Sequence, residues 1–584
     1  MSIRKYIFTF FLLGLAYILF WNNDANLIIA GISIFLIGMF FMEDGFKLFS
    51  GGIMEKILKN TTSTVPRAIA IGFIMTTTLQ SSSLLTVVII SFLSAELITL
   101  GGAIGVIFGS NIGSTTTAWI VSAFGVDINI AQFALPMITF GVVFRFKESK
   151  MYKGAGTVLL GLGFVFLGIA YMKDGFEALS NGIDLASYAV DGYLGVLVYV
   201  LIGAVATVVI QSSGATMALI ITALALGQIE YYNALSLAIG ANIGTTVTAI
   251  IGSLSSNSNG KRLAVAHLIF NVVTAFVAIV FLYQLASFVG VLSEFVGIDE
   301  KNYAMQLALF HTIFNVLGIL LVAPFTSYLV KYLESIFVVI EDVDRAKYLD
   351  DVVIHVPDAA LEAIKKEVQH LYDNAIEVIS HALLLHRHQY LGCEDMAEVI
   401  KKSDKDIHTD IDMFYDKNIK EIYGQIIYYA TLATQENMSE DQKDKIYKLK
   451  LSCRDIVESI KFVRELQKNI RIYLKSNNEI MKDEYNFLRT QIAKTIDAIN
   501  DIRILEDDFD ILSSIELLKE ELDSSNATQN SKIDSYIRAN QIRTKMATSL
   551  INDSSFAYEI SKNLILVASV LWIKDKDIHK LKEN

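Results

Sequence analysis

Two short polar clusters interrupt long apolar stretches of this chain. They consist of Gln80, Ser81, Ser82 and Ser83, and of Gln211, Ser212 and Ser213. Hydroxyl and amide groups can donate hydrogen bonds to an anion, and their oxygens suit a hard cation. No nucleophile–base pair or metal triad stands out anywhere in the sequence, so we expect reversible binding here and no enzymatic reaction.

A second polar motif follows each cluster by about thirty residues. It reads "GSNIGSTTT" at 109–117 and "GANIGTTVT" at 240–248. No Gly-Lys-Ser/Thr follows, so these glycines do not form a nucleotide-binding loop. The two motifs lie 131 residues apart, as the two Gln-Ser-Ser clusters do.

The shared offset indicates that half of the chain is a duplication. Upstream, "MEDGFKLFSGGI" at 42–53 matches "MKDGFEALSNGI" at 172–183 with an offset of 130. We place repeat 1 at about 27–145 and repeat 2 at about 154–286. A repeat of this length in an apolar chain is typical of secondary transporters.

Composition separates the chain into two domains. Of the 584 residues 53% are hydrophobic, and long apolar runs fill the first part. We therefore expect a membrane domain at 1–345, which includes a retained first span, and a soluble domain at 346–584. The net charge of −12 gives no support for nucleic-acid binding. The two cysteines fit a reducing cytoplasm.

The distribution of basic residues predicts that the two repeats have opposite orientations. Arg4 and Lys5 place the N-terminus inside, and basic residues recur after the spans expected at 27–42 and 131–145. The span at 27–42 then runs inward, whereas its counterpart at 154–172 runs outward. Further spans are expected at 98–122, 232–254, 262–286 and 303–327, and the C-terminus lies inside.

This orientation requires that the apolar segments 68–95 and 194–226 each enter and leave on one side. Each has a polar cluster in its middle, which predicts two re-entrant hairpins with their tips near the bilayer centre. The repeat symmetry then brings the two tips to face each other. The expected fold is therefore an all-α polytopic membrane protein with inverted repeats and two re-entrant hairpins, plus a cytoplasmic helical bundle.

The midplane has almost no charged side chains. Between 68 and 122 the only acid is Glu96, and between 194 and 256 it is Glu230. Two helix N-termini that converge there favour an anion, and without basic residues its charge must be offset by bound cations. Na⁺ suits such a site better than H⁺. His267 and His311 are expected to donate hydrogen bonds inside the bundle.

These motifs resemble those of the type II sodium–phosphate cotransporters, specifically the bacterial members, over about residues 25–335. The resemblance implies Na⁺-driven transport of inorganic phosphate by alternating access, with Na⁺ as coupling ion and no organic cofactor. It implies that the two Gln-Ser-Ser clusters contact phosphate and Na⁺. It also implies that the following residues line the site or hold Na⁺: Asn111, Ser114, Thr115, Thr116, Asn242, Thr245 and Thr246. Gly214 departs from the pattern, because the first cluster has Ser83 there.

The polar half shows the spacing of amphipathic helices. Apolar residues from Leu361 to Ala382 recur at alternating three and four positions, which predicts a helical bundle. The region resembles the PhoU-like domains that follow bacterial sodium–phosphate cotransporters. In such a domain Asp406 and Asp410 could share a helix face and bind a metal. A solvated acidic face is the favoured alternative.

Two other functions remain open from the sequence. The chain could carry a different small anion, such as sulfate or a carboxylate, or it could sense phosphate and signal through its helical domain. We expect a multi-pass protein of the bacterial inner membrane with both termini in the cytoplasm. Its expected partners are phosphate, Na⁺ and the lipid bilayer, and the sequence leaves a homo-oligomer open.

Overall fold

The computed structural model describes residues 13–573 apart from short gaps, and every regular element in that part is helical. The gaps are 15, 18, 51–56, 59–61, 126–130, 181–189, 191, 255, 338–344, 351–352, 394, 404–410 and 437. The expected all-α fold is confirmed for the described residues. The chain divides into two compact units, Met1–Val339 with Asp350–Val352, and Ile340–Leu349 with Val353–Asn584.

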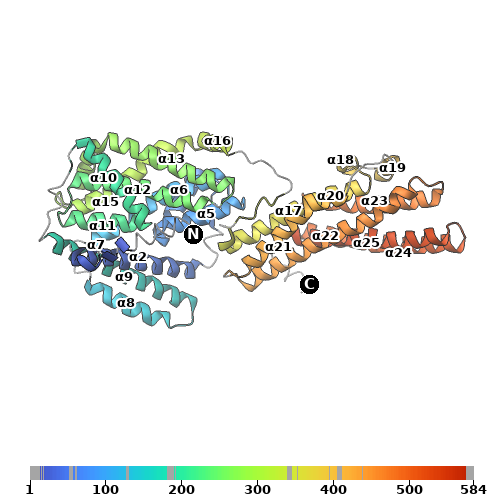
Figure 1. Ribbon diagram of the computed structural model, residues 1–584, viewed down its shortest axis with the longest axis horizontal. Helices are drawn as coiled ribbons and strands as arrows, with labels where there is room; N and C mark the ends of the chain where they lie inside the picture. The colour runs from blue at the N-terminus through green and yellow to red at the C-terminus, as the bar shows by residue number, and fades with distance from the viewer. Residues whose placement is uncertain are drawn as a thin grey trace. The chain divides into compact units, whose positions relative to one another are not determined.

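Unit 1 contains the two repeats (Figure 1). Its helices are α2 (Asn23–Ser50), α4 (Val65–Leu79), α5 (Ser82–Ser94), α6 (Leu100–Gly113), α7 (Thr115–Gly125), α8 (Ala131–Arg145), α9 (Lys150–Ser180), α10 (Gly192–Ile210), α11 (Ser213–Ala225), α12 (Tyr231–Ser253), α13 (Ser258–Val280), α14 (Leu282–Phe295), α15 (Tyr303–Val322) and α16 (Thr326–Ile336).

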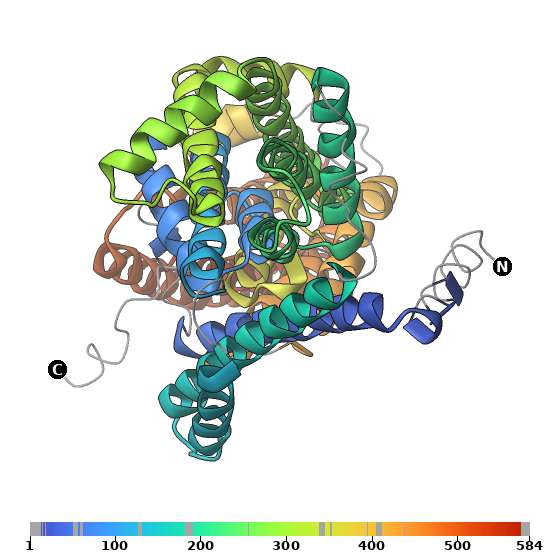
Figure 2. The same ribbon diagram turned by 90° about the vertical axis from the view of Figure 1, so that its left-hand side faces the viewer.

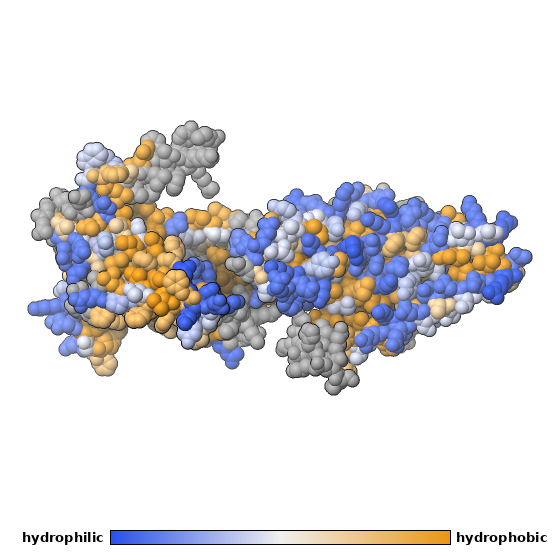
Figure 3. Space-filling model, turned by 90° about the horizontal axis from the view of Figure 1, so that it is seen from below, coloured by the Kyte–Doolittle hydropathy of each residue, from blue (hydrophilic) through white to orange (hydrophobic). Residues whose placement is uncertain are grey.

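On the face seen in Figure 3, hydrophobic residues gather over the middle of unit 1, whereas hydrophilic residues predominate over unit 2 and enclose smaller hydrophobic patches. On α10, for example, Leu197, Leu201 and Val205 are each more than half exposed, while Gly203 on the opposite face is buried. Seven helical segments in the described part are long and apolar enough to cross a membrane. One of them is α10, a helix that we expected to turn back within the bilayer.

Helices α2 and α9 begin the two repeats and pack against each other in antiparallel fashion. A Cβ atom added at Gly31 would lie 2.7 Å from the oxygen of Gly168, and one at Gly38 would lie 2.6 Å from the oxygen of Gly161. The 130-residue offset relates Gly31 to Gly161 and Gly38 to Gly168. The contacts are therefore reciprocal, as across a two-fold axis, which agrees with inverted repeats. Figure 2 shows these two helices side by side, with α8 beside α9.

Each polar cluster lies at the turn of a helical hairpin. Helices α4 and α6 run parallel, because a Cβ at Gly105 would meet Val65 and one at Gly113, two turns later on α6, would meet Phe73, two turns later on α4. The helix between them, α5, must therefore run back from the end of α4 to the start of α6. The equivalent contacts of α10 and α12 give α11 the same return path. The depth of these hairpins in a bilayer stays a prediction.

Unit 2 is a bundle of long helices. They are α17 (Pro357–Ala382), α18 (Arg387–Tyr390), α19 (Met396–Lys402), α20 (Ile411–Tyr415), the π-helix η4 (Asp416–Lys420), α21 (Glu421–Ala433), α22 (Glu440–Tyr473), α23 (Glu479–Ile502), α24 (Asp508–Arg538) and α25 (Thr544–Leu571). The apolar seam predicted on α17 is buried, except that Leu361 is half-buried.

The buried guanidinium of Arg489 fixes two helix ends in this bundle. It is 1% exposed and donates to the carbonyl oxygens of Leu383 and Leu384, just after α17. It also donates to the carbonyls of Ile400 and Ser403 at the end of α19. Carbonyls at a helix C-terminus lack intrahelical partners and carry partial negative charge, so the cation satisfies both ends at once.

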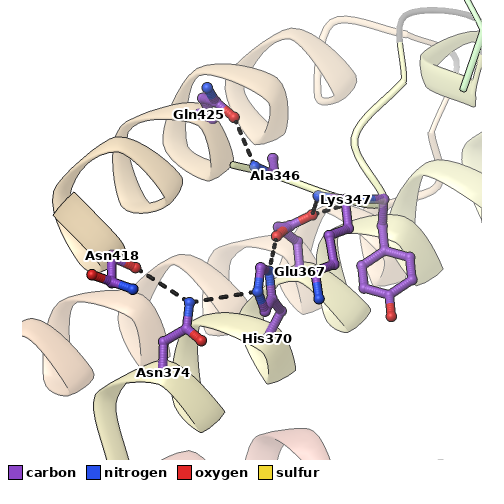
Figure 4. Close-up of polar contacts among 8 residues, drawn as sticks. Ala346, Lys347, Glu367, His370, Asn374, Asn418 and Gln425 are labelled. Atoms are coloured by element: carbon purple, nitrogen blue, oxygen red, sulfur yellow. Dashed lines mark hydrogen bonds and ion pairs between the residues drawn. The ribbon is translucent and has the colours of Figure 1, made fainter. Parts of the chain in front are cut away.

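Unit 2 begins with a segment held by a buried carboxylate (Figure 4). Glu367 on α17 is fully buried, and its Oε2 accepts from the backbone N–H groups of Lys347 and Tyr348 at 2.8 Å. The preceding N–H, of Ala346, donates to Gln425 on α21. Three consecutive backbone donors are therefore bound to side chains. His370 donates through Nδ1 to the other carboxylate oxygen at 2.7 Å.

Candidate functional site

A cavity of about 380 Å³ in unit 1 brings the two polar clusters together. Its lining includes all seven residues of the clusters, which come from the turns of the α4–α5 and α10–α11 hairpins. The remaining lining residues are Leu36, Met39, Phe40, Glu43, Ser114, Thr117, Thr207, Val209, Ile210, Gly214, Thr245 and Thr248. The site therefore takes residues from both repeats, as the repeat symmetry predicts.

The backbone at both hairpin turns has the same geometry. Gln80 and Gln211 end their helices with φ values of 54° and 57°, in the left-handed region that side chains seldom adopt. The next residues, Ser81 and Ser212, cap α5 and α11. Each serine oxygen accepts the N–H three residues on, at 3.2 Å. The pairing of left-handed glutamine and capping serine directs both helix N-termini into the cavity.

Several donors at these N-termini remain available to a ligand. The first two N–H groups of each helix have no intrahelical acceptor, and none binds another group in the part of the chain that the structure describes. They belong to Ser82, Ser83, Ser213 and Gly214. Together with the partial positive charge at two helix N-termini, four N–H groups form a site suited to an anion with several oxygens.

The two glutamines are not equivalent, although their sequence positions are. The Gln80 amide nitrogen donates to Thr116 Oγ1 at 2.9 Å, and its Oε1 accepts from Thr117 Oγ1 at 2.8 Å. Gln211 is exposed to the cavity, and its amide has no partner among the described residues. One cause lies in the sequence of repeat 2, because Val247 occupies the position equivalent to Thr116. The counterpart of Thr117, Thr248, keeps its hydroxyl but donates it to the carbonyl oxygen of Thr245 at 2.7 Å.

The departure at Gly214 has a packing reason. A Cβ atom at Gly214 would lie 3.3 Å from Thr117 Cγ2 and 3.4 Å from its hydroxyl oxygen. Thr117 is also the residue that donates to Gln80, so this threonine lies between the two hairpin turns. A glycine at 214 lets the second turn approach α7 closely, which a serine would hinder.

The expected Na⁺-binding residues fall into two groups. Ser114 and Thr245 line the cavity, together with Thr117 and Thr248, which the sequence analysis did not single out. The others do not line it: Asn111, Thr115, Thr116, Asn242 and Thr246. Asymmetry in the motif, Ser-Thr-Thr-Thr against Thr-Thr-Val-Thr, gave no indication of which hydroxyls face inward.

The two asparagines instead bind the two histidines. The Asn111 side-chain oxygen lies 3.3 Å from His267 Nε2, and that of Asn242 lies 3.1 Å from His311 Nε2. An amide oxygen only accepts, so each histidine donates from Nε2. This agrees with the role expected for His267 and His311 inside the bundle, and it leaves the asparagine oxygens engaged in the described structure.

One charged side chain lines the cavity, and the sequence analysis missed it. Glu43 lies on the same face of α2 as Leu36, Met39 and Phe40, opposite the glycines that pack on α9. Its Oε1 accepts from Lys47 Nζ at 2.8 Å. The spacing of the two hairpins did not predict that α2 lies beside the cavity. The acid in the "MEDGF" motif was therefore not predicted to be a site residue.

The predicted metal ligands Asp406 and Asp410 lie outside the described residues. The neighbouring Asp412 and Asp416 are exposed and pair with Arg464 and Lys420. No group of three potential acidic, histidine or cysteine metal ligands occurs within the described ranges. The metal site in unit 2 stays a prediction.

Comparison with known proteins adds independent information. The sequence matches the Na⁺/Pi-cotransporter family at residues 34–174 and 195–322. It is 30% identical over 296 residues to the uncharacterized protein YqeW of Bacillus subtilis. This alignment covers 50% of this chain and 92% of YqeW. It is 24% identical over 357 residues to YjbB of Escherichia coli K12, provisionally named an inorganic phosphate export protein. That alignment covers 59% of this chain and 62% of YjbB.

A shorter match involves human sodium-dependent phosphate transport protein 2B. The identity is 38% over 85 residues, which are 14% of this chain and 12% of the human protein. No solved structure matches the chain. The family match ends at residue 322, before unit 2 begins, so this match bears on unit 1.

Proposed function

Because the chain belongs to the Na⁺/Pi-cotransporter family, we propose that it moves inorganic phosphate across the membrane together with Na⁺. The observation that supports this most is the single cavity shared by both Gln-Ser-Ser clusters. The names of two relatives point the same way, since one refers to phosphate export and one to sodium-dependent phosphate transport.

Phosphate would bind between the two hairpin turns. Its oxygens would accept from the four free N–H groups and from the hydroxyls of Ser82 and Ser213, which have no partner among the described residues. Gln211 would contribute an amide that both donates and accepts. A protonated phosphate oxygen can donate to the Gln211 carbonyl, whereas sulfate at neutral pH has no such donor. This difference favours phosphate over sulfate.

Na⁺ would enter with phosphate as a second substrate. Among the described residues that line the cavity there is no lysine, arginine or histidine, so none of them offers a basic side chain to offset the charge of a bound anion. The hydroxyls of Ser114, Thr117, Thr245 and Thr248 supply neutral oxygen ligands of the kind that hard cations prefer. Cation binding would therefore strengthen anion binding and couple the two fluxes.

The asymmetry of the cavity supports transport by alternating access. Leu36 and Met39 of α2 line it, but their counterparts on α9, Phe166 and Ile169, are buried. Exchange of the conformations of the two inverted repeats would bury the α2 residues and expose the α9 residues. Glu43 lies toward the end of α2 that the charge distribution of the loops places inside, and we infer from this that the present cavity opens toward the cytoplasm.

Unit 2 would act as a cytoplasmic regulatory domain of the PhoU-like type. Support comes from its helical bundle, its position after the transporter unit and the heptad seam of α17. Both termini would then lie on the cytoplasmic side of the bacterial inner membrane. The ligand that such a domain would respond to is not identified by its described residues.

Phosphate uptake into proteoliposomes tests the proposal directly. Purified protein should accumulate labelled phosphate under an inward Na⁺ gradient and not under an equal K⁺ gradient. Gln211→Ala should raise the phosphate concentration for half-maximal uptake, while Gln132→Ala, an exposed residue outside the cavity, should have no effect.

The alternatives predict different results. If the protein takes up sulfate strongly with Na⁺, and excess phosphate or arsenate does not reduce this uptake, then sulfate and not phosphate is the transported anion. Binding of phosphate by folded protein without flux under any gradient would support a sensor, in which unit 2 reports the occupancy of the cavity.

A further inference from the structure

Glu43 gives the cavity a carboxylate that neither the sequence motifs nor the family comparison assigns to a function. It is the one charged residue among the lining residues, and its side chain is 19% exposed. A carboxylate beside an anion site raises the energy of the bound anion unless a cation lies near both. Its presence in this cavity therefore needs a physical explanation.

The hydrogen bonding of Glu43 leaves one oxygen unoccupied. Lys47, one turn later on α2, contacts Oε1 at 2.8 Å and also lies 3.7 Å from Asp44. Oε2 has no partner among the residues that the structure describes. Lys47 itself does not line the cavity. The pair thus leaves Oε2 of a cavity-lining residue without a described partner, while Lys47 stays outside the lining.

The repeat symmetry is broken at this position. The residue equivalent to Glu43 in "MKDGF" is Lys173, and the residue equivalent to Lys47 is Glu177. The acid and the base have exchanged places between the two repeats. At this position of the repeat, α2 therefore carries an acid and α9 a base. The α2 carboxylate can serve a cation in the conformation in which α2 lines the cavity.

We propose that Glu43 binds a transported Na⁺ through Oε2 in the conformation with the cavity open beside α2. This inference rests on the proposed Na⁺-coupled transport and identifies one ligand of the cation. A carboxylate oxygen together with cavity hydroxyls is a hard-oxygen donor set that suits Na⁺. The bound cation removes the repulsion between Glu43 and phosphate, so that occupancy of one site favours occupancy of the other.

Three substitutions on α2 test the assignment in the full-length protein. Glu43→Gln should raise the Na⁺ concentration for half-maximal phosphate uptake by roughly tenfold, since the amide keeps an oxygen but loses the charge. Asp44→Asn is the matched control, because Asp44 is an exposed neighbour that does not line the cavity. It should leave this Na⁺ concentration unchanged.

Lys47→Gln should change the Na⁺ concentration for half-maximal uptake in the direction opposite to Glu43→Gln. Removal of the competing ammonium should lower the Na⁺ concentration for half-maximal uptake, which a merely destabilised protein would not show. The assignment is wrong if Glu43→Gln and Asp44→Asn have the same Na⁺ dependence. It is also wrong if Glu43→Gln alters only the pH profile of uptake, which would make Glu43 a proton site.

A binding measurement separates this inference from the proposed function. Na⁺ without phosphate should raise the melting temperature of the wild-type protein in detergent, and this rise should be reduced in Glu43→Gln. If the wild type shows the Na⁺ effect but carries no phosphate, the proposed function fails and the Glu43 site stands. If Na⁺ stabilises both proteins equally, the Glu43 site fails whatever the uptake shows.

Discussion

At the scale of the residue, the two turns of the cavity have the same backbone and different side-chain partners. Gln80 is fixed by Thr116 and Thr117, and Gln211 is not. Val247 lacks the hydroxyl of Thr116, and Thr248 donates its hydroxyl to the carbonyl oxygen of Thr245. We interpret Gln80 as a residue that positions the first turn and Gln211 as a residue that contacts the transported anion. The two repeats thus have a glutamine at equivalent positions, and we assign the two glutamines different roles.

Val247→Thr tests this difference. The new hydroxyl should engage the Gln211 amide as Thr116 engages Gln80, and the phosphate concentration for half-maximal uptake should rise about three- to tenfold, the equivalent of one hydrogen bond. Val247→Ala, which also changes the side chain but adds no hydroxyl, should not raise it. Equal effects of both substitutions on uptake would show that packing, and not the amide, matters here.

At the scale of the element, close helix contacts set the position of the hairpins. Small residues let α4 pack on α6 and α10 pack on α12 along their length, and these contacts repeat at the 131-residue offset. Without a hydrophobic driving force between helices in lipid, such close packing is a main source of association. The breaks at Gln80 and Gln211 can then point to one place.

Gly240→Ala should weaken the α10–α12 contact. Its Cβ would lie 2.0 Å from the oxygen of Val200, so the helices would have to separate, at a cost of about 2 kcal/mol or more. Gly252→Ala on the same helix has open space around the new methyl and should be neutral or slightly stabilising. Melting temperatures of the two variants in detergent provide the comparison, and equal values would contradict the packing argument.

The buried Glu367 should control the order of the segment at 345–348. In Glu367→Ala the N–H groups of Lys347 and Tyr348 lose their acceptor, so trypsin should cleave after Arg345 or Lys347 about tenfold faster. Glu362→Ala, on the same helix but without a described hydrogen bond, is the control. Cleavage at unchanged rate in Glu367→Ala would mean that Gln425 and side-chain packing suffice to hold the segment.

At the scale of the whole molecule, the inverted repeats provide two conformations from one architecture. Met39 on α2 lines the cavity, and its counterpart Ile169 on α9 is fully buried. An exchange of repeat conformations would reverse these environments. The asymmetry in a symmetric architecture is therefore the main structural argument for alternating access.

Cysteine labelling tests the exchange. In a Cys393→Ser background, Met39→Cys should react with a maleimide from the cytoplasmic side, whereas Ile169→Cys should react only when Na⁺ and phosphate allow turnover. Burial raises the pKa of the remaining Cys453 thiol, which keeps it protonated and unreactive. Equal reactivity of both introduced cysteines under all conditions would contradict the two-conformation mechanism.

The sequence by itself determined the helical class, the duplication and the two polar clusters, because apolar periodicity and repeated motifs are local properties of the chain. It also indicated that the clusters would meet, since inverted repeats relate them by a two-fold axis. The depth of the hairpins, the domain functions and the residue roles stay predictions.

Only the tertiary structure decided which polar atoms are free. Gln80 and Gln211 are the same residue in the same motif, yet only Gln80 is fixed, by hydroxyls more than thirty residues away in the sequence. At the equivalent positions of repeat 2 one hydroxyl is absent and the other is bonded elsewhere. Asn111 and Asn242 are engaged by histidines from other helices, and Glu43 reaches the cavity from a helix that carries neither cluster. Availability for binding depends on which groups the fold brings within hydrogen-bond distance, and no local pattern records this.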